Sequence, residues 1–157
     1  MAEKKYWLMK SEPYAYSIDD LKRDGKTPWS GVRNYEARNI MRDQMAVGDR
    51  ALFYHSNVQP PAIVGEMEVC SKPYADPLQF NPNSDYFDDK SSESSPRWYL
   101  VDLKFVRKFN QPVTREMLKN EMELSEMQLF KRNRLSITKV EPAEYRKILK
   151  LSEEEVV

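Results

Sequence analysis

Four polar side chains follow an apolar run in the first half of the chain. The run Ala51–Phe53 leads directly into Tyr54-His55-Ser56-Asn57, and all four of these side chains can hydrogen-bond or stack. Similar polar and aromatic clusters adjoin other hydrophobic segments, at Lys10–Pro13, Trp29–Tyr35 and Arg97–Trp98. Because a rigid scaffold presents its binding groups on loops at strand ends, these clusters predict one pocket for a flat, hydrogen-bonding ligand.

His55 and Ser56 are candidates for a catalytic base and its nucleophile. Neighbouring side chains on a strand point to opposite faces, so this pair cannot form the hydrogen bond that such a dyad needs. Ser11 could approach His55 from another strand, but the chain has no Gly-x-Ser-x-Gly motif. For His55, a structural role and a ligand contact both stay open.

Other catalytic and cofactor-binding patterns find little support. The four glycines are dispersed and form neither a dinucleotide-binding motif nor a P-loop. One histidine and one cysteine cannot build an ordinary zinc site, so we expect no metal and no cofactor. Asp88-Asp89 lies among other loop charges and is expected to face solvent rather than to act as an acid and base pair.

Trp29 lies in a short segment that combines a stacking group with hydrogen-bonding groups. The segment Val32-Arg33-Asn34-Tyr35 follows Trp29 closely and adds the guanidinium of Arg33 and the amide of Asn34. An indole, a guanidinium and an amide can together stack on a planar base and recognise its edge. Arg97-Trp98 repeats the pairing. Because a single tryptophan is more often part of a core, both interpretations stay open for Trp29, whereas Trp7 is assigned to the core.

Basic residues are grouped near these clusters. Arg33, Arg38 and Arg42 follow Trp29, and Lys131-Arg132-Asn133-Arg134 lies far downstream. Each of them alone is most simply a solvated helix charge, but a group that converges beside an aromatic pocket could hold phosphates. The sequence therefore predicts a phosphate rim made of Arg38, Lys131 and Arg132.

The hydrophobic patterns predict the elements that must position these residues. Strands are expected at 5–10, 50–55, 63–69, 97–109 and 135–140, and helices at 17–25, 34–45, 114–118, 125–130 and 142–149. In the third strand, alternation predicts that Ile63, Gly65, Met67 and Val69 share one face. The long segment 72–96 is expected to be an ordered loop pinned by its aromatic residues. Together these elements favour a small mixed α+β barrel flanked by helices.

Composition narrows the class of protein further. With 157 residues, 40% hydrophobic and 32% charged, the chain is expected to form one globular domain. Lys+Arg and Asp+Glu are both 25, and a net charge of zero argues against a strongly basic wrapper of duplex DNA. Cys70 is the only cysteine, and no apolar stretch is long enough for a membrane span. With no signal peptide visible either, a cytoplasmic location is expected, while the oligomeric state stays open.

The chain resembles the EVE-domain family of thymocyte nuclear protein-like sequences. The residues that carry the resemblance are Tyr6–Pro13, Trp29–Asn39, Gly48-Asp49, Phe53–Asn57, Tyr86–Lys90, Pro96–Trp98 and Arg134–Ser136. The match covers almost the whole chain in order, and residues 1–157 are expected to form a single EVE domain. Three small departures are Ala62 where Gly is usual, Ala75 where Pro is expected, and Thr138-Lys139 in place of a Gln-Pro pair.

The resemblance implies a PUA-like fold, a curved β-barrel of about five or six strands flanked by short helices. It also implies a pocket that accepts a modified nucleobase, with 5-methylcytosine-type DNA bases as the associated substrate class. We therefore expect a non-enzymatic module whose partner is a nucleic acid, DNA or RNA, that carries a modified base. The residues predicted to bind the ligand are Ser11, Trp29, Arg33, Asn34, Tyr35, Tyr54, His55, Ser56, Asn57, Arg97, Trp98, Arg134 and Ser136.

Two alternatives from other functional classes stay open. One is a small nuclease or hydrolase that acts on modified nucleotides, which would need a metal-binding carboxylate group or an activated nucleophile. The other is a sensor of a free nucleotide-like molecule, which would need the pocket but no basic rim. Turnover of a modified oligonucleotide in the presence of a divalent metal separates the enzyme from the binding module, and binding of a free nucleoside separates the sensor.

Overall fold

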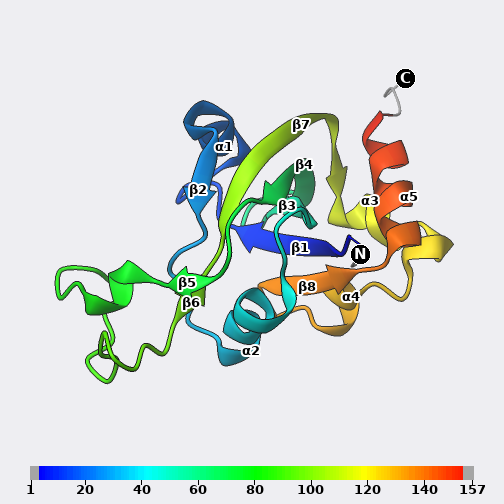
Figure 1. The fold of residues 1–157 in the computed structure, drawn as a ribbon. Coiled ribbons are helices and arrows are strands. Elements are labelled where there is room, and N and C mark those ends of the chain that lie inside the picture. Colours follow the sequence, from blue (N-terminus) through cyan, green and yellow to red (C-terminus); the bar gives the residue numbers. More distant parts are fainter. Residues whose placement is uncertain (1–3, 154–157) are drawn as a thin grey trace.

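The chain forms a PUA-like curved β-barrel with short helices around it, which confirms the expected fold class (Figure 1). This computed structural model describes residues 4–153. A six-stranded sheet has the order β2-β7-β4-β3-β1-β8. Its strands are β1 (Tyr6–Ser11), β2 (Lys26–Pro28), β3 (Arg50–His55), β4 (Ala62–Val69), β7 (Asp102–Thr114) and β8 (Ile137–Val140), and β5 (Tyr74–Ala75) pairs with β6 (Tyr99–Leu100) in a second sheet.

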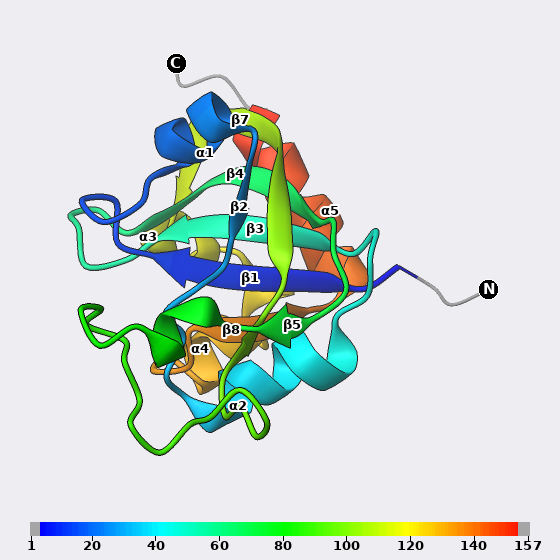
Figure 2. The ribbon, with the colours of Figure 1, turned by 60° about the vertical axis from the view of Figure 1, so that its left-hand side comes forward.

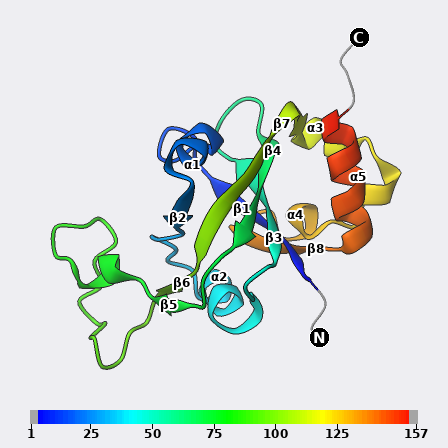
Figure 3. The same ribbon diagram turned by 45° about the horizontal axis from the view of Figure 1, so that its top comes forward.

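Short helices surround the sheet on several sides (Figures 1 and 2). The helices are α1 (Ile18–Asp24), α2 (Tyr35–Asn39), α3 (Arg115–Lys119), α4 (Gln128–Lys131) and α5 (Pro142–Glu153), and α2 continues as the π-helical turn η1 (Ile40–Gln44). Two 3₁₀ turns, η2 (Pro77–Phe80) and η3 (Met122–Leu124), complete the described part. Figure 3 shows that the loop between β5 and β6 projects on the side opposite α5.

The pairing of β1 brings distant segments to one end of the sheet. β1 runs parallel to β3, and Ser11 at the end of β1 is in register with His55 at the end of β3. Ser56 N donates to the Ser11 carbonyl oxygen at 3.0 Å. On the other side of β1, Lys10 N donates to the carbonyl oxygen of Ser136, just before β8. Three stretches that lie far apart in the sequence therefore meet where β1 ends.

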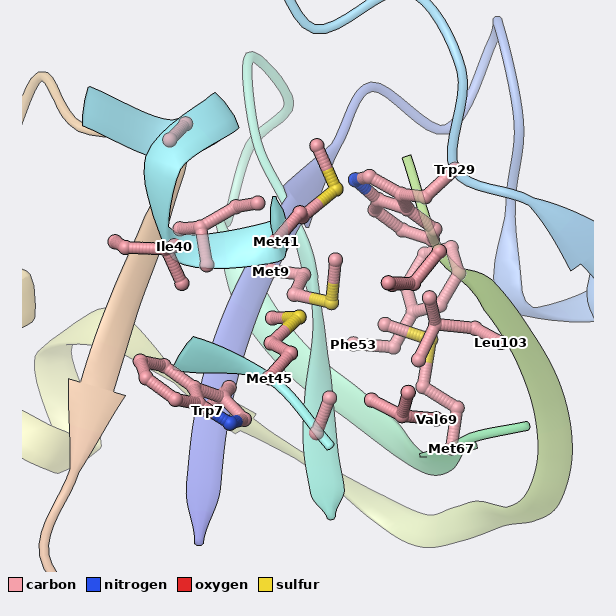
Figure 4. Close-up of a cluster of buried hydrophobic side chains, with 14 of the residues drawn as sticks. Trp7, Met9, Trp29, Ile40, Met41, Met45, Phe53, Met67, Val69 and Leu103 are labelled. Carbon is pink, nitrogen blue, oxygen red and sulfur yellow. The ribbon is translucent and has the colours of Figure 1, made fainter. Parts of the chain in front are cut away.

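Alternation along β1 divides the core into two clusters. Trp7 and Met9 belong to one cluster and Leu8 to the other, because successive side chains on a strand point to opposite faces. The first cluster, shown in Figure 4, also holds Phe53 from β3 and Met41 from η1. The second cluster is completed by α5. Both faces of the central strands are thus covered.

Strand β4 departs from the expected alternation. Ile63 packs in the second cluster, whereas Met67 and Val69 pack in the first. The register between β4 and β7 shifts between Ile63 and Gly65, and this irregularity moves Ile63 to the other face. The prediction that the four residues share one face was therefore wrong for Ile63.

The predicted helix starts are correct at Ser17 and Asn34, where the sequence offered a capping side chain that the structure uses. Ser17 caps α1, since its hydroxyl accepts from Asp20 N while the Asp20 carboxylate accepts from Ser17 N. Asn34 caps α2 by accepting from Ala37 N at 3.0 Å. The helix expected at 125–130 begins only at Gln128, because Ser125 closes the preceding turn η3 instead of capping a new helix.

A buried glutamine and two of the aromatic residues hold the long loop in place. Gln79 Nε2 donates to the carbonyl oxygens of Asp76 and Trp98, both at 2.8 Å. Its Oε1 accepts from Ser91 Oγ at 2.7 Å and from Trp98 N at 3.0 Å. Two aromatic residues that were expected to pin the loop contribute as well: the Tyr74 hydroxyl donates to Asp102 Oδ1 at 2.6 Å, and the Tyr86 ring packs against Gly31. Phe87 is exposed to solvent. Backbone groups buried in a long loop need partners, and one amide supplies both donors and acceptor.

Gly65 marks a place where the sheet has no room for a side chain. A Cβ there would lie 2.6 Å from the carbonyl oxygen of Arg107 and 2.7 Å from Cδ1 of Ile18. We predict that Gly65→Ala lowers the free energy of unfolding by about 1–3 kcal/mol, measured by urea denaturation, because the backbone oxygen cannot move aside. Adding Ile18→Val to this variant should recover only part of the lost free energy of unfolding. An unfolding free energy equal to that of the parent chain would contradict the prediction.

Candidate functional site

A cleft of about 910 Å³ opens where β1 and β3 end. Its lining comes from the end of β1 and the turn after it, from the segment after β2, from the residues that follow β3, from the long loop, and from the approach to β8. The lining residues are Lys10, Ser11, Glu12, Tyr14, Ala15, Tyr16, Thr27, Pro28, Trp29, Ser30, Gly31, Val32, Arg33, Ser56, Asn57, Tyr86, Asn133, Arg134 and Ser136.

The cleft brings together seven of the thirteen residues predicted to bind a ligand. They are Ser11, Trp29, Arg33, Ser56, Asn57, Arg134 and Ser136. These residues come from four separate stretches of the sequence, and the meeting of β1, β3 and the approach to β8 explains their convergence. The other six, which are Asn34, Tyr35, Tyr54, His55, Arg97 and Trp98, are not part of this lining.

His55 supports the helix beside the cleft instead of lining it. Its Nε2 accepts from the backbone N–H of Ile18 at 3.1 Å, in the first turn of α1, and its ring packs edge-on against Phe53. Burial lowers the pKa of His55, Asp19 opposes this shift, and Lys108 adds to it. A neutral imidazole is the form that can accept this hydrogen bond. Ser56, on the opposite side of the chain, does line the cleft.

Four more predicted residues build the wall behind the cleft. Asn34 is occupied as the cap of α2, and Tyr35 stacks on Trp98 with ring centroids 4.8 Å apart. The indole N–H of Trp98 donates to Asp88 Oδ2 at 2.7 Å, and Arg97 lies 3.9 Å from the same carboxylate. Asp88 was expected to face solvent, but this hydrogen bond holds it and lowers the pKa of its carboxyl group.

Tyr54 was also expected at the pocket and lies in the second core cluster instead. In β3 it alternates with Phe53, whose ring belongs to the first cluster. The register between β3 and β4 shifts at this point, between Phe53 and Tyr54. Sequence proximity to Ser56 therefore does not bring the Tyr54 side chain into the cleft lining.

Arg33 lines the cleft, but neighbouring groups already use its guanidinium. It pairs with the buried carboxylate of Asp76 at 3.1 Å and donates to the carbonyl oxygens of Tyr86 at 2.8 Å and Val32 at 2.9 Å. Asp76 also accepts from Gly31 N at 2.8 Å. Arg33 and Asp76 therefore fasten the segment after β2 to the long loop and shape this wall of the cleft.

Trp29 belongs both to the core and to the cleft. It is 8% exposed and meets Phe53 edge to face, with centroids 5.6 Å apart, at the border of the cluster in Figure 4. The indole N–H of Trp7 donates to Asp49, whereas within residues 4–153 that of Trp29 has no hydrogen-bond partner. Trp29 thus borders both the core and the cleft, so its substitution must also affect stability.

The three cations of the predicted phosphate rim lie outside the cleft lining. Lys131 pairs with Glu126 at 2.5 Å, and Arg132 pairs with Glu36. Arg38 donates to the carbonyl oxygen of Arg97 at 2.7 Å and stacks over Tyr35. A contact of these groups with phosphate stays a prediction, and each would have to share the cation with its present partner.

Several lining residues were not among the thirteen residues predicted to bind the ligand. Lys10 and Glu12 belong to the polar cluster 10–13 at the end of β1, which was predicted to line the pocket as a group. Tyr14 is 75% exposed on the turn after β1. The ring of Tyr86 lies against Gly31, where a Cβ would approach its Cζ to 2.9 Å. The contact between Tyr86 and Gly31 joins residues far apart in sequence and leaves no local signal.

All three departures from the family pattern fall in strands, with Thr138-Lys139 in β8 of the six-stranded sheet. Ala62 lies in β4, paired with His55. Ala75 ends the short strand β5, directly before the buried Asp76. Neither residue lines the cleft, so neither changes its shape by direct contact.

Among residues 4–153, no group of three or more His, Cys, Asp or Glu side chains is arranged to hold a metal ion. No helix in the same range combines the length and the apolar character needed to cross a membrane. The cleft lining combines aromatic rings, hydrogen-bonding side chains and charged groups. Such a lining suits a planar, polar ligand.

The fold and the cleft define a small PUA-like module with one large cleft at the end of its parallel strands. The EVE domain model matches residues 5–151, and the chain belongs to the EVE domain family. Human thymocyte nuclear protein 1 is 40% identical over 169 aligned residues, which cover 96% of this chain and 75% of the human protein.

Two solved structures resemble the chain over nearly its whole length. A hypothetical protein from Leishmania major superposes with a TM-score of 0.93 at 45% identity, covering 96% of each chain. Human THYN1 protein, in a crystal structure in complex with 5-methylcytosine containing DNA, superposes with a TM-score of 0.92 at 38% identity. That match covers 98% of this chain and 100% of the human one.

His55 is the only histidine of the chain, which makes its titration measurable without interference. Because its pKa is lowered on folding, the unfolded chain binds more protons below the ordinary value of 6.5. The contribution of His55 to the free energy of unfolding is therefore fully present above about pH 6.5 and is lost as the pH falls through the lowered pKa. We predict that melting temperatures decrease on acidification in this window, and that His55→Gln, which retains an acceptor for Ile18 N, reduces this pH dependence.

The same prediction is open to a direct check by NMR. The single imidazole signal should titrate below its ordinary pKa of 6.5. A midpoint at or above that value would show that His55 is not buried as a neutral acceptor.

Proposed function

We propose that the chain is a binding module for nucleic acid that carries a modified base, and that its cleft accommodates an extruded base of the 5-methylcytosine type. The observation that carries this proposal is the human THYN1 structure, a relative seen with 5-methylcytosine containing DNA that matches this chain over 98% of its length. The cleft supplies the second support, because its lining combines aromatic and polar side chains.

The chemistry of the lining suits a cytosine-type base. Such a base presents an amino group as donor, and carboxylate oxygens are its usual protein acceptors. Glu12 is the carboxylate of the cleft lining, and Ser56 and Asn57 lie near it, because Ser56 N bonds to the carbonyl oxygen of Ser11. Trp29 offers an unpaired indole N–H and an aromatic surface against which a planar base can pack.

The energetic balance of this binding mode is modest. Extrusion of a base from a duplex costs a few kcal/mol, and stacking returns about 1–3 kcal/mol per base. Phosphate contacts add a term that depends on salt. With zero net charge, the chain gains little from a general attraction to nucleic acid, so selectivity must come from the cleft.

The binding module is tested directly by comparing duplexes that differ only in methylation. Fluorescence anisotropy should give a higher affinity for a duplex with one central 5-methylcytosine than for the same duplex with cytosine. Equal affinities would contradict the proposal. The sensor alternative would instead bind the free methylated nucleoside as tightly as the duplex, and the enzyme alternative would show turnover of the duplex with a divalent metal present.

Two tryptophans of the same core cluster provide a matched pair of variants. Trp29 lines the cleft, whereas Trp7 is 1% exposed and is not part of that lining. We predict that Trp29→Phe weakens binding of the methylated duplex about tenfold, equivalent to about 1.4 kcal/mol, because the indole N–H and part of the stacking surface are lost. Trp7→Phe should lower the melting temperature and leave affinity unchanged.

The comparison is made on folded protein, after thermal melts of both variants. An equal loss of affinity in Trp7→Phe would mean that the effect of Trp29→Phe comes from the core rather than from contact with the base. An unchanged affinity in Trp29→Phe would place the base elsewhere.

A further inference from the structure

We propose that Lys10, together with Arg134, binds a phosphate group of the nucleic acid at one end of the cleft. This inference rests on the proposed function and specifies where the sugar-phosphate chain runs when a base is in the cleft. It is separate from the basic rim predicted from the sequence, whose three cations lie outside the cleft lining.

Lys10 carries a charge that the protein leaves uncompensated. Its side chain is partly buried near the end of β1, and its Nζ donates to the carbonyl oxygen of Asn133 at 2.7 Å. Nζ also lies 6.0 Å from the centre of the Tyr54 ring. Within residues 4–153, no carboxylate lies within ion-pair distance of this ammonium group.

The surroundings of Lys10 disfavour its positive charge. Burial lowers the pKa of Lys10, and the nearby guanidinium of Arg115 lowers it further. Arg115 lies in the first turn of α3 with its guanidinium over the ring of Phe130. Two cations held close together in a partly dry place cost free energy, and an anion that binds between or beside them recovers it.

Most other cations nearby are already neutralised. Arg33 pairs with Asp76, and Lys131 pairs with Glu126. In the cleft lining, Lys10 and Arg134 are the cations without a carboxylate partner in the described range, and Glu12 is the only carboxylate. With Arg33 balanced by Asp76, the lining keeps one net positive charge, located at the end where Lys10, Asn133 and Arg134 meet.

A phosphate group matches this end of the cleft in charge and in position. A nucleotide whose base enters the cleft carries a phosphate on each side of its sugar, so one phosphate must lie near the cleft mouth. Lysine is a compact point charge with three donors, and one donor to Asn133 leaves two for an anion. Arg134 is exposed on the same short segment and can contact the same group.

The test compares three ligands that differ in their phosphates. They are the free nucleoside 5-methyl-2′-deoxycytidine, its 5′-monophosphate, and a single-stranded oligonucleotide with one 5-methylcytosine. The variant Lys10→Gln removes the charge but keeps an amide donor for the Asn133 carbonyl. Lys139→Gln is the matched control, because Lys139 is an exposed lysine on the neighbouring strand β8 that does not line the cleft.

We expect Lys10→Gln to leave nucleoside binding unchanged and to weaken binding of the oligonucleotide about tenfold at low salt. The slope of log affinity against log salt should become shallower by about 1, the effect of losing one phosphate contact. The monophosphate reports which phosphate is bound: a loss there assigns the 5′ phosphate, and a loss with the oligonucleotide alone assigns the 3′ one. Lys139→Gln should behave as the parent chain does.

Thermal melts separate a binding role from a structural one. Since the charge of Lys10 is uncompensated, Lys10→Gln should melt at the same temperature as the parent chain or higher. A lower melting temperature, an equal loss for nucleoside and oligonucleotide, or an unchanged salt slope would each overturn the phosphate site.

The inference and the proposed function can fail separately. If the parent chain binds neither these three ligands nor the methylated duplex, the proposed function is wrong, and the phosphate site is then judged with inorganic phosphate alone. Saturable binding of phosphate to the parent chain that Lys10→Gln abolishes would support the site, and its absence would overturn it.

Discussion

The parallel pairing of β1 with β3 is the constraint on which the cleft depends. In-register pairing places the end of β1 beside the end of β3, and the hydrogen bond from Ser56 N to the Ser11 carbonyl extends that pairing into the loops. The approach to β8 joins the same point through Lys10 N and the Ser136 carbonyl. A shift of one residue in this register would send Ser11 and its neighbours to the opposite face.

The opposite wall of the cleft depends on two buried polar side chains. Asp76 accepts a hydrogen bond from Gly31 N and pairs with Arg33, both in the segment after β2. Gln79 lies in the same loop as Asp76 and bonds this loop to the backbone of Trp98. Unpaired, such buried groups would cost free energy, and here each finds several partners. The long loop is consequently an ordered part of the site rather than an extension that happens to lie beside it.

Local patterns in the sequence predicted the elements well, and contacts between distant residues explain most of what was missed. The apolar stretch around Trp7 predicted β1, and the capping residue Asn34 predicted the start of α2. Glu36 neutralises Arg132 although the two lie 96 residues apart, and neither local sequence predicts this ion pair. Lys10 was not predicted as a cation of the cleft for the same reason. Whether carboxylates surround its ammonium group depends on the folded structure and not on the local sequence.

The most direct test of the base-binding cleft uses the indole N–H signals of the three tryptophans. Those of Trp7 and Trp98 are bonded to Asp49 and Asp88, whereas that of Trp29 has no partner in the described structure and lies in the cleft lining. In a ¹H–¹⁵N NMR titration with a 5-methylcytosine oligonucleotide, the account predicts that the Trp29 indole signal shifts strongly while the other two shift little. A titration that moves Trp7 or Trp98 and leaves Trp29 in place would contradict it.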